Sequence, residues 1–213
     1  MVNVPWLTFC ADQYAVAEHR PNDPATMSAY DVFVREIFEQ FLLFMHAGYH
    51  LYLWPGVGEP YANSDAMRAD VRENKRLWVY RTDDEFPTDH PLGAPSPIAG
   101  WRQNDHFRAV HDLVGHAWPG FSFSVRGEEA ACRAQALHHS AAALPALVCE
   151  TRMQSAWIFF GPHRRGGPTA PLVFPPQKAF CPQGGCLHYD RWLDEQDNSH
   201  NDGLINEQEG MNS

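Results

Sequence analysis

The sequence has no run of about 18 consecutive apolar residues, which is the length that a membrane-spanning helix requires. Basic residues are also few: 16 Lys and Arg against 26 Asp and Glu give a formal net charge of −10. A nucleic-acid backbone would therefore meet no basic face. The N-terminus lacks the charged region and long apolar stretch of a secretory signal. We expect neither a membrane nor a nucleic-acid partner, and a cytoplasmic location.

Cysteine is also scarce, and its count is odd. An odd number of scattered cysteines is not the framework of a disulfide-stabilised secreted domain, so we expect reduced thiols. One zinc site is worth weighing, at Cys181, Cys186 and His188, although the four-residue gap is at the edge of the usual spacing and no fourth ligand is evident. The five cysteines are Cys10, Cys132, Cys149, Cys181 and Cys186.

The length of 213 residues and the hydrophobic fraction of 44% are those of one folded domain. We expect this domain over residues 1–190, with an acidic, flexible tail over 191–213. Residues 1–24 carry three prolines, Pro5, Pro21 and Pro24, without a sustained period. This stretch is predicted to be an irregular arm lying on the domain.

Periodicity predicts a mainly α protein with one or two short strands, an α+β fold in the broad sense. Apolar residues recur at steps of three and four in most segments, and turn residues separate these segments. The region 83–100 contains four prolines and is predicted to be a surface loop. Ser28 is the expected N-cap of the first helix. The predicted helices are 28–46, 64–74, 104–115, 128–139 and 144–161, and the predicted strands are 49–54 and 77–80.

The strongest local signal is a pair of histidines, His111 and His116, five residues apart. Residues five apart on a straight α-helix lie about 140° apart around the axis, so both side chains cannot point at one ion. The helix must therefore end or distort between them, and Gly115 is the expected end. Imidazole suits Fe, Zn, Cu and Ni, and two imidazoles with one carboxylate form the ligand set of non-haem iron oxygenases.

Glu150 is the expected carboxylate ligand because it lies in an otherwise apolar helical stretch, where an unpaired charge would be costly. Its neighbours Ala146 and Met153 fall on nearly the same helix face, which predicts that Glu150 is buried. Glu128 and Glu129 are the competing donors. They open a predicted helix, however, where a Glu often serves the helix dipole.

The run His111-Asp-Leu-Val-Gly-His116 resembles the His-Glu-Leu-Leu-Gly-His element of the pterin-dependent aromatic amino acid hydroxylases. The resemblance covers about fifty residues. It implies iron bound by His111 and His116, with Glu150, by its order along the chain, completing the triad. Asp112 stands where that family has Glu, the gap from histidine to glutamate is shorter, and no pterin site can be assigned.

The sequence thus predicts a mononuclear non-haem iron oxygenase that oxidises a small organic substrate, with Fe(II) as the first choice of metal and Zn or Mn as alternatives. Asp112 would orient an imidazole or take part in catalysis, and Arg152 or Arg126 would bind an acidic group of the substrate. An apolar pocket wall is expected from four aromatic residues, Trp118, Phe121, Phe123 and Trp157.

Three alternatives stay open. His111-Asp112 also resembles the start of the HD-type phosphohydrolase segment, but no Asp lies between Leu113 and Tyr189 to supply the further aspartate of those sites. A zinc peptidase is less consistent, because its His-Glu-x-x-His motif has a different spacing. The third alternative is a non-enzymatic α-rich interaction module, in which the histidines and Glu150 form a buried hydrogen-bond network.

Overall fold

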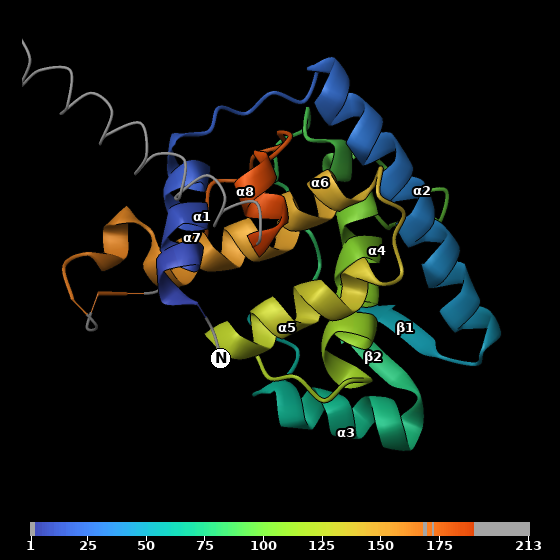
Figure 1. Cartoon of the computed structure of the whole chain (residues 1–213). Coiled ribbons are helices and arrows are strands. Elements are labelled where there is room, and N and C mark those ends of the chain that lie inside the picture. The colour runs from blue at the N-terminus through green and yellow to red at the C-terminus, as the bar shows by residue number, and fades with distance from the viewer. Residues whose placement is uncertain (1–2, 168–169, 172, 190–213) are drawn as a thin grey trace, which may run out of the picture.

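The computed structural model describes residues 3–167, 170–171 and 173–189, and the tail expected over 191–213 lies outside these residues. The fold is mainly helical with one small sheet, as the sequence predicts (Figure 1). The two strands, β1 (His50–Leu53) and β2 (Arg76–Val79), run parallel, with His50 opposite Arg76 and Leu53 opposite Val79. Helix α3 (Ser64–Asn74) makes the crossover between them, which parallel pairing requires.

The remaining helices form the body of the molecule. Two of the long helical segments contain a π-helical turn, η2 or η3, and two 3-10 turns, η1 and η4, lie in the connections. The bounds are α1 Val4–Val16, α2 Pro24–His46, η1 Pro91–Gly93, α4 Gln103–Val110, η2 His111–Ala117, α5 Val125–Ala136, α6 Leu144–Val148, η3 Cys149–Met153, α7 Gln154–Phe160, η4 Pro162–Arg164 and α8 Gly184–Leu187.

The N-terminal segment is a helix, so the prediction of an irregular arm was wrong. Pro5 lies in the first turn of α1, where a missing N–H breaks no helical hydrogen bond, and the Asn3 side chain caps that turn by accepting from the Trp6 N–H at 3.0 Å. The buried face of α1 packs against α7. It comprises Trp6, Leu7, Cys10, Ala11 and Tyr14.

Helix α2 begins at Pro24, four residues before the expected Ser28. Asp23 is its N-cap and accepts from the backbone N–H of Ala25 and of Thr26. The sequence signal for this start, an Asp followed by a Pro, is a strong one. The prolines at both helix starts had been interpreted as breaks, although each is in a position that a helix accepts.

The core consists of two clusters of buried side chains. The larger one joins α2, α4 and the sheet through residues such as Phe33, Phe41, Leu77 and Leu113. The smaller one joins α1 to α7 and α8 around Trp6. Helix α5 packs against the π turn η2, and α6, η3 and α7 follow one another as a single bent rod (Figure 1). None of the described helices is long and apolar enough to span a membrane.

Candidate metal centre

The sequence predicts that the helix carrying the two histidines ends at Gly115. Instead, it continues past Gly115 as a π-helical turn. After Val110 it continues as the π turn η2, and the Trp118 N–H reaches the Leu113 carbonyl five residues earlier, at 3.0 Å. Residues five apart are neighbours along such a turn. The Nε2 atoms of His111 and His116 therefore lie 3.1 Å apart. Distortion of the helix was predicted correctly, and the way in which it distorts was not.

Gly115 contributes space to this turn. A Cβ at Gly115 would lie 3.0 Å from the Cβ of Ala131 and 3.4 Å from Nδ1 of His111. These distances are at or near the limit of ordinary contact, so the missing side chain lets α5 approach η2 closely. That approach brings the first turns of α5 to the two imidazoles.

Both imidazoles turn their Nδ1 atoms toward oxygen. Nδ1 of His111 lies 2.9 Å from Oε1 of Gln135, and Nδ1 of His116 lies 3.3 Å from the carbonyl oxygen of Phe121. Because neither oxygen can donate, each Nδ1 carries the proton and each Nε2 presents a lone pair. This is the arrangement of metal-binding histidines, whose second nitrogen usually donates to a carbonyl or carboxylate.

Glu128 on α5 supplies the carboxylate. Its Oε2 lies 3.7 Å from Nε2 of His111 and 3.6 Å from Nε2 of His116. The three ligand atoms lie within 4.8 Å of one another, and no other such group occurs in the part of the chain that the structure describes. The expected ligand Glu150 is not a member of this group. The structure thus favours Glu128, one of the two competing donors.

The charges of this cluster attract a cation. Burial alone would raise the pKa of Glu128, but hydrogen bonds and charge from the two imidazoles outweigh it and lower that pKa to about 2. Burial alone would lower the pKa of His111, but the hydrogen bond with Glu128 and the negative charge of that carboxylate outweigh burial and raise the pKa. The carboxylate is therefore anionic, and its charge is compensated either by a proton on Nε2 of His111 or by a metal ion bound to the Nε2 lone pairs of the neutral imidazoles.

Glu150 is buried, as predicted, but in a different network. Tyr30 donates its hydroxyl to Oε1, and Gln154 donates from Nε2 to Oε2 at 2.8 Å. His90 accepts the Leu92 N–H at Nδ1, so its Nε2 carries the proton and points at Oε1 of Glu150, 3.3 Å away. Neutral hydrogen-bond donors therefore stabilise the Glu150 carboxylate, for which the sequence had predicted a bound metal.

A pocket of about 440 Å³ lies against the cluster and has the size of a small-molecule site. All three cluster residues line it, and so do both Asp112 and Glu150. Much of the remaining wall is apolar, with Arg108 as a cation among the polar groups. The apolar residues of the wall include Phe107, Phe123, Ile158 and Phe159.

Asp112 is half-buried and lies in the pocket wall beside the cluster. Burial raises its pKa, against the opposing charges of His111 and His116. Its carboxyl group can therefore exchange a proton more readily near neutral pH than an exposed aspartate can. No hydrogen bond from Asp112 to an imidazole occurs in the described residues, so the structure gives it no orienting contact.

Arg152, the predicted substrate-binding residue, is not among the residues that line this pocket. Its guanidinium binds Glu129 through two hydrogen bonds, of 2.8 and 3.0 Å, and also donates to the Cys186 and Leu187 carbonyls. This buried ion pair connects η3, α5 and α8. Arg126 is exposed and also lies outside the pocket wall.

The expected aromatic wall is only partly correct. Phe123 lines the pocket, whereas Trp118 packs against Phe44 and Tyr49 on the outside of η2, and Trp157 stacks near His163. Phe107 and Phe159 take the expected place. Phe107 and Phe159 lie on helices whose apolar faces the sequence assigns to the core and not to a pocket.

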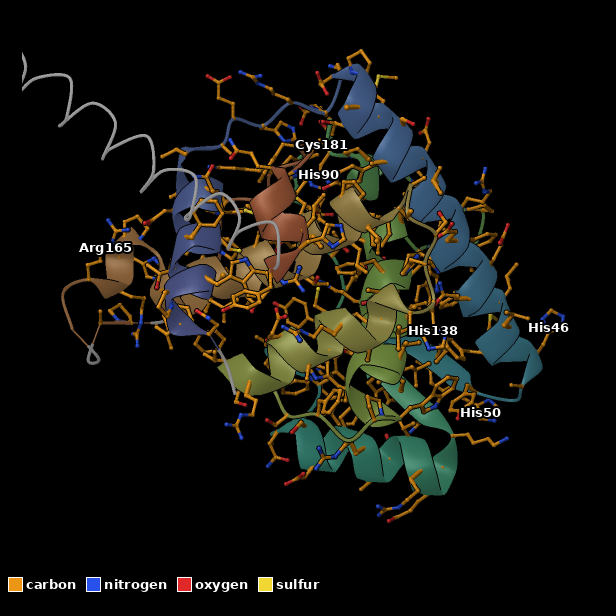
Figure 2. The ribbon with its side chains drawn as sticks, viewed as in Figure 1. His46, His50, His90, His138, Arg165 and Cys181 are labelled. Carbon is orange, nitrogen blue, oxygen red and sulfur yellow. The ribbon has the colours of Figure 1, made fainter. Side chains whose placement is uncertain are left out.

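The other histidines lie apart from the cluster. His46 and His50 are exposed at the edge of the molecule, at the end of α2 and the start of β1 (Figure 2). His106 is fully buried, stacked on Trp101 and against Phe41. The zinc alternative at Cys181, Cys186 and His188 forms no ligand group within the described ranges, and all five cysteines are free.

Comparison with known proteins identifies no relative. No protein-family model matches the sequence, no curated protein matches it, and no solved structure matches the fold. The resemblance to the aromatic amino acid hydroxylases stays a prediction, based on the short histidine motif.

Proposed function

We propose that the protein is a mononuclear metal enzyme whose ion is held by His111, His116 and Glu128. One observation carries this proposal. Two imidazole Nε2 atoms and a carboxylate converge at the wall of a pocket, while both Nδ1 atoms face oxygen acceptors. A metal held by three protein ligands would keep coordination positions for substrate or water, as catalytic sites require and closed structural sites do not.

Fe(II) is the metal that we propose, and oxidation of a small organic substrate by dioxygen is the reaction. Two histidines and one carboxylate with open positions are the ligands of non-haem Fe(II) oxygenases. Bound Fe(II) would supply the binding and reduction of dioxygen. The protein's own contribution is to fix the two imidazoles through Gln135 and Phe121 and to bind an apolar substrate against Phe107 and Phe159.

Two carboxyl groups could act on a substrate beside the ion. Asp112 and Glu150 both line the pocket, and neither belongs to the ligand group. Glu150 is held rigidly by Tyr30 and Gln154, so it can accept a hydrogen bond from substrate without moving. Asp112 is the group that we propose for proton transfer at the metal.

A metal-dependent hydrolase is the second candidate, and the same two carboxyl groups favour it. With Zn or Mn in place of iron, the ion would lower the pKa of a water molecule, and Asp112 would accept its proton. The HD-type arrangement itself is not supported, because Glu150, its only substitute for the downstream aspartate, lies outside the ligand group.

Reconstitution tests the proposal. Protein purified without oxygen and loaded with Fe(II) should retain about one iron per chain after gel filtration. It should bind nitric oxide at an open position and consume dioxygen when ascorbate supplies the two electrons that hydroxylation needs besides those of the substrate. A His111→Ala and a Glu128→Ala variant should lose the iron.

The controls separate the two chemistries. An exposed-glutamate variant, Glu73→Ala, should retain iron fully, since Glu73 pairs with Arg72 on the surface of α3, away from the cluster. Zn- or Mn-loaded protein should not hydrolyse nucleotide phosphoesters. Phosphate release that disappears in His111→Ala would move the assignment to the hydrolase, and a wild-type protein that binds no metal would exclude both.

A further inference from the structure

Gln135 is a fully buried amide on α5 that contacts the candidate metal centre without belonging to it. Its Oε1 lies 2.9 Å from Nδ1 of His111. Its Nε2 is buried and has no hydrogen-bond partner among the described residues. Proteins pair nearly all of their buried polar groups, so an amide left half-satisfied calls for an explanation. Of the two polar atoms of this side chain, the oxygen is the one that makes a hydrogen bond among the described residues.

The amide oxygen decides which nitrogen of His111 can bind a metal. A neutral imidazole has one N–H, and Oε1 cannot donate, so the hydrogen must be on Nδ1. Nε2 then presents its lone pair toward Nε2 of His116 and the Glu128 carboxylate. With the amide turned by 180°, Gln135 would donate to Nδ1, the hydrogen would move to Nε2, and that nitrogen could no longer be a ligand.

The two histidines differ in the group that keeps the hydrogen on Nδ1. A backbone carbonyl, that of Phe121, holds Nδ1 of His116, and no side-chain substitution removes it. For His111, the corresponding acceptor is a side chain, that of Gln135. Gln135 projects from α5, the same helix that brings Glu128 to the cluster, so one helix sets both the carboxylate and the orientation of the first imidazole.

We infer that Gln135 is a positioning residue of the metal centre, which holds His111 in the tautomer and ring orientation that bind the ion. The inference rests on the proposed function, because it needs a metal at His111, His116 and Glu128. Gln135 itself touches neither metal nor substrate. Its effect should appear in the metal affinity of the folded protein, in addition to any loss of stability that the metal-free protein shows.

Metal titration of the full chain tests this, with Co(II) as a spectroscopic probe and Fe(II) under anaerobic conditions, each in competition with a chelator. Gln135→Leu removes the acceptor, and Gln135→Met does so with an unbranched side chain of similar length. Both should weaken binding about 10- to 100-fold, the usual effect of losing such a partner. Gln135→Glu keeps an acceptor and should bind at least as tightly as wild type.

Gln40→Leu is the matched control. Gln40 also has one buried amide atom, Oε1, without a partner in the part of the chain that the structure describes, while its Nε2 donates to the His138 carbonyl, away from the cluster. Its metal affinity should equal that of wild type. Thermal unfolding of each metal-free variant provides the second readout, since a merely structural residue would lower this melting temperature and leave the affinity of the folded protein unchanged.

The outcomes separate this inference from the proposed function. Wild-type protein that binds neither Co(II) nor Fe(II) would end both. Wild-type binding with Gln135→Leu and Gln135→Met within about twofold of it would overturn the positioning role alone. Weak binding by Gln135→Glu would also overturn it, because a carboxylate oxygen should replace the amide oxygen. If only one apolar variant folds, the comparison of that variant with Gln135→Glu still decides.

Discussion

Replacing Glu128 with Ala should abolish metal-dependent stabilisation, whereas replacing Glu150 with Ala should leave it intact. Oε2 of Glu128 lies 3.6 and 3.7 Å from the two imidazole nitrogens, distances that a shared ion explains. Glu150 instead accepts hydrogen bonds from Tyr30 and Gln154. The two glutamates line one pocket, so the pair of variants compares ligand with neighbour at nearly the same place.

The expected magnitudes follow from mass action. Free metal at about 100 times the dissociation constant stabilises the folded protein by about 2.7 kcal/mol. For a chain of this size, that corresponds to an increase in melting temperature of about 5–10 °C. If loss of Glu128 weakens binding about 100-fold, the same metal concentration contributes only about 0.4 kcal/mol, or about 1 °C.

Glu150→Ala should behave in the opposite way. The metal-free protein should lose about 1–3 kcal/mol, because the Tyr30 hydroxyl and the Gln154 amide lose a buried acceptor. The increase in melting temperature on adding metal should remain about 5–10 °C. Differential scanning calorimetry with and without metal measures both quantities for each variant. A metal-induced increase that persists in Glu128→Ala and disappears in Glu150→Ala would refute the ligand assignment.

Three further predictions follow from the packing and the buried charges. Gly115→Ala should destabilise the protein by about 1–3 kcal/mol in denaturant titrations and weaken metal binding, since its Cβ would press on Ala131 and the His111 ring; unchanged values for both would contradict the packing argument. Burial lowers the pKa of His106 from 6.5 to about 4, so the unfolded chain takes up this proton first as the pH falls. The contribution of His106 to the free energy of unfolding should therefore decrease by about 3 kcal/mol between pH 7 and pH 4. In a His106→Phe variant, the free energy of unfolding should depend less on pH, as denaturant unfolding at each pH measures. Arg152→Ala should cost up to about 3–5 kcal/mol, because the buried Glu129 then keeps only its ion pair with the more exposed Arg133 among the described residues, and an equally stable variant with altered substrate binding would support the predicted role in catalysis.

Local patterns in the sequence predicted most of the helices and the histidine pair. Five predicted helices and both strands are present in the described part of the chain, 64–74 with the predicted ends and the others with shifted ends, because apolar periodicity reports which face of a segment is buried. The segment around Pro5 was missed because proline was interpreted as a break. The spacing of Trp6, Cys10 and Tyr14 would have indicated a helix, had the first-turn position of that proline been considered.

The carboxylate ligand could not be predicted with the same security. Burial of Glu150 followed from its apolar neighbours, but burial does not say which buried partner a side chain meets. Its Oε1 accepts a hydrogen bond from Tyr30 on α2 and lies 3.3 Å from Nε2 of His90, and no local sequence pattern indicates either contact. The start of α5 was also placed three residues late, but Glu128 does lie in the first turn of this helix, so its position along the helix could not distinguish a partner of the helix dipole from a metal ligand.

The π turn at His111–Ala117 makes the spacing of the two ligands conditional on helix type. On a regular α-helix, residues four apart share a face, and on a π turn residues five apart do. The two spacings therefore present the same pair of imidazoles. A one-residue deletion between His111 and His116 should therefore be tolerated where the π turn becomes an α turn, because both spacings place the two imidazoles on one face. A one-residue insertion fits neither spacing and should separate the two imidazoles. It should therefore be far more damaging than substitutions at the positions between the two histidines.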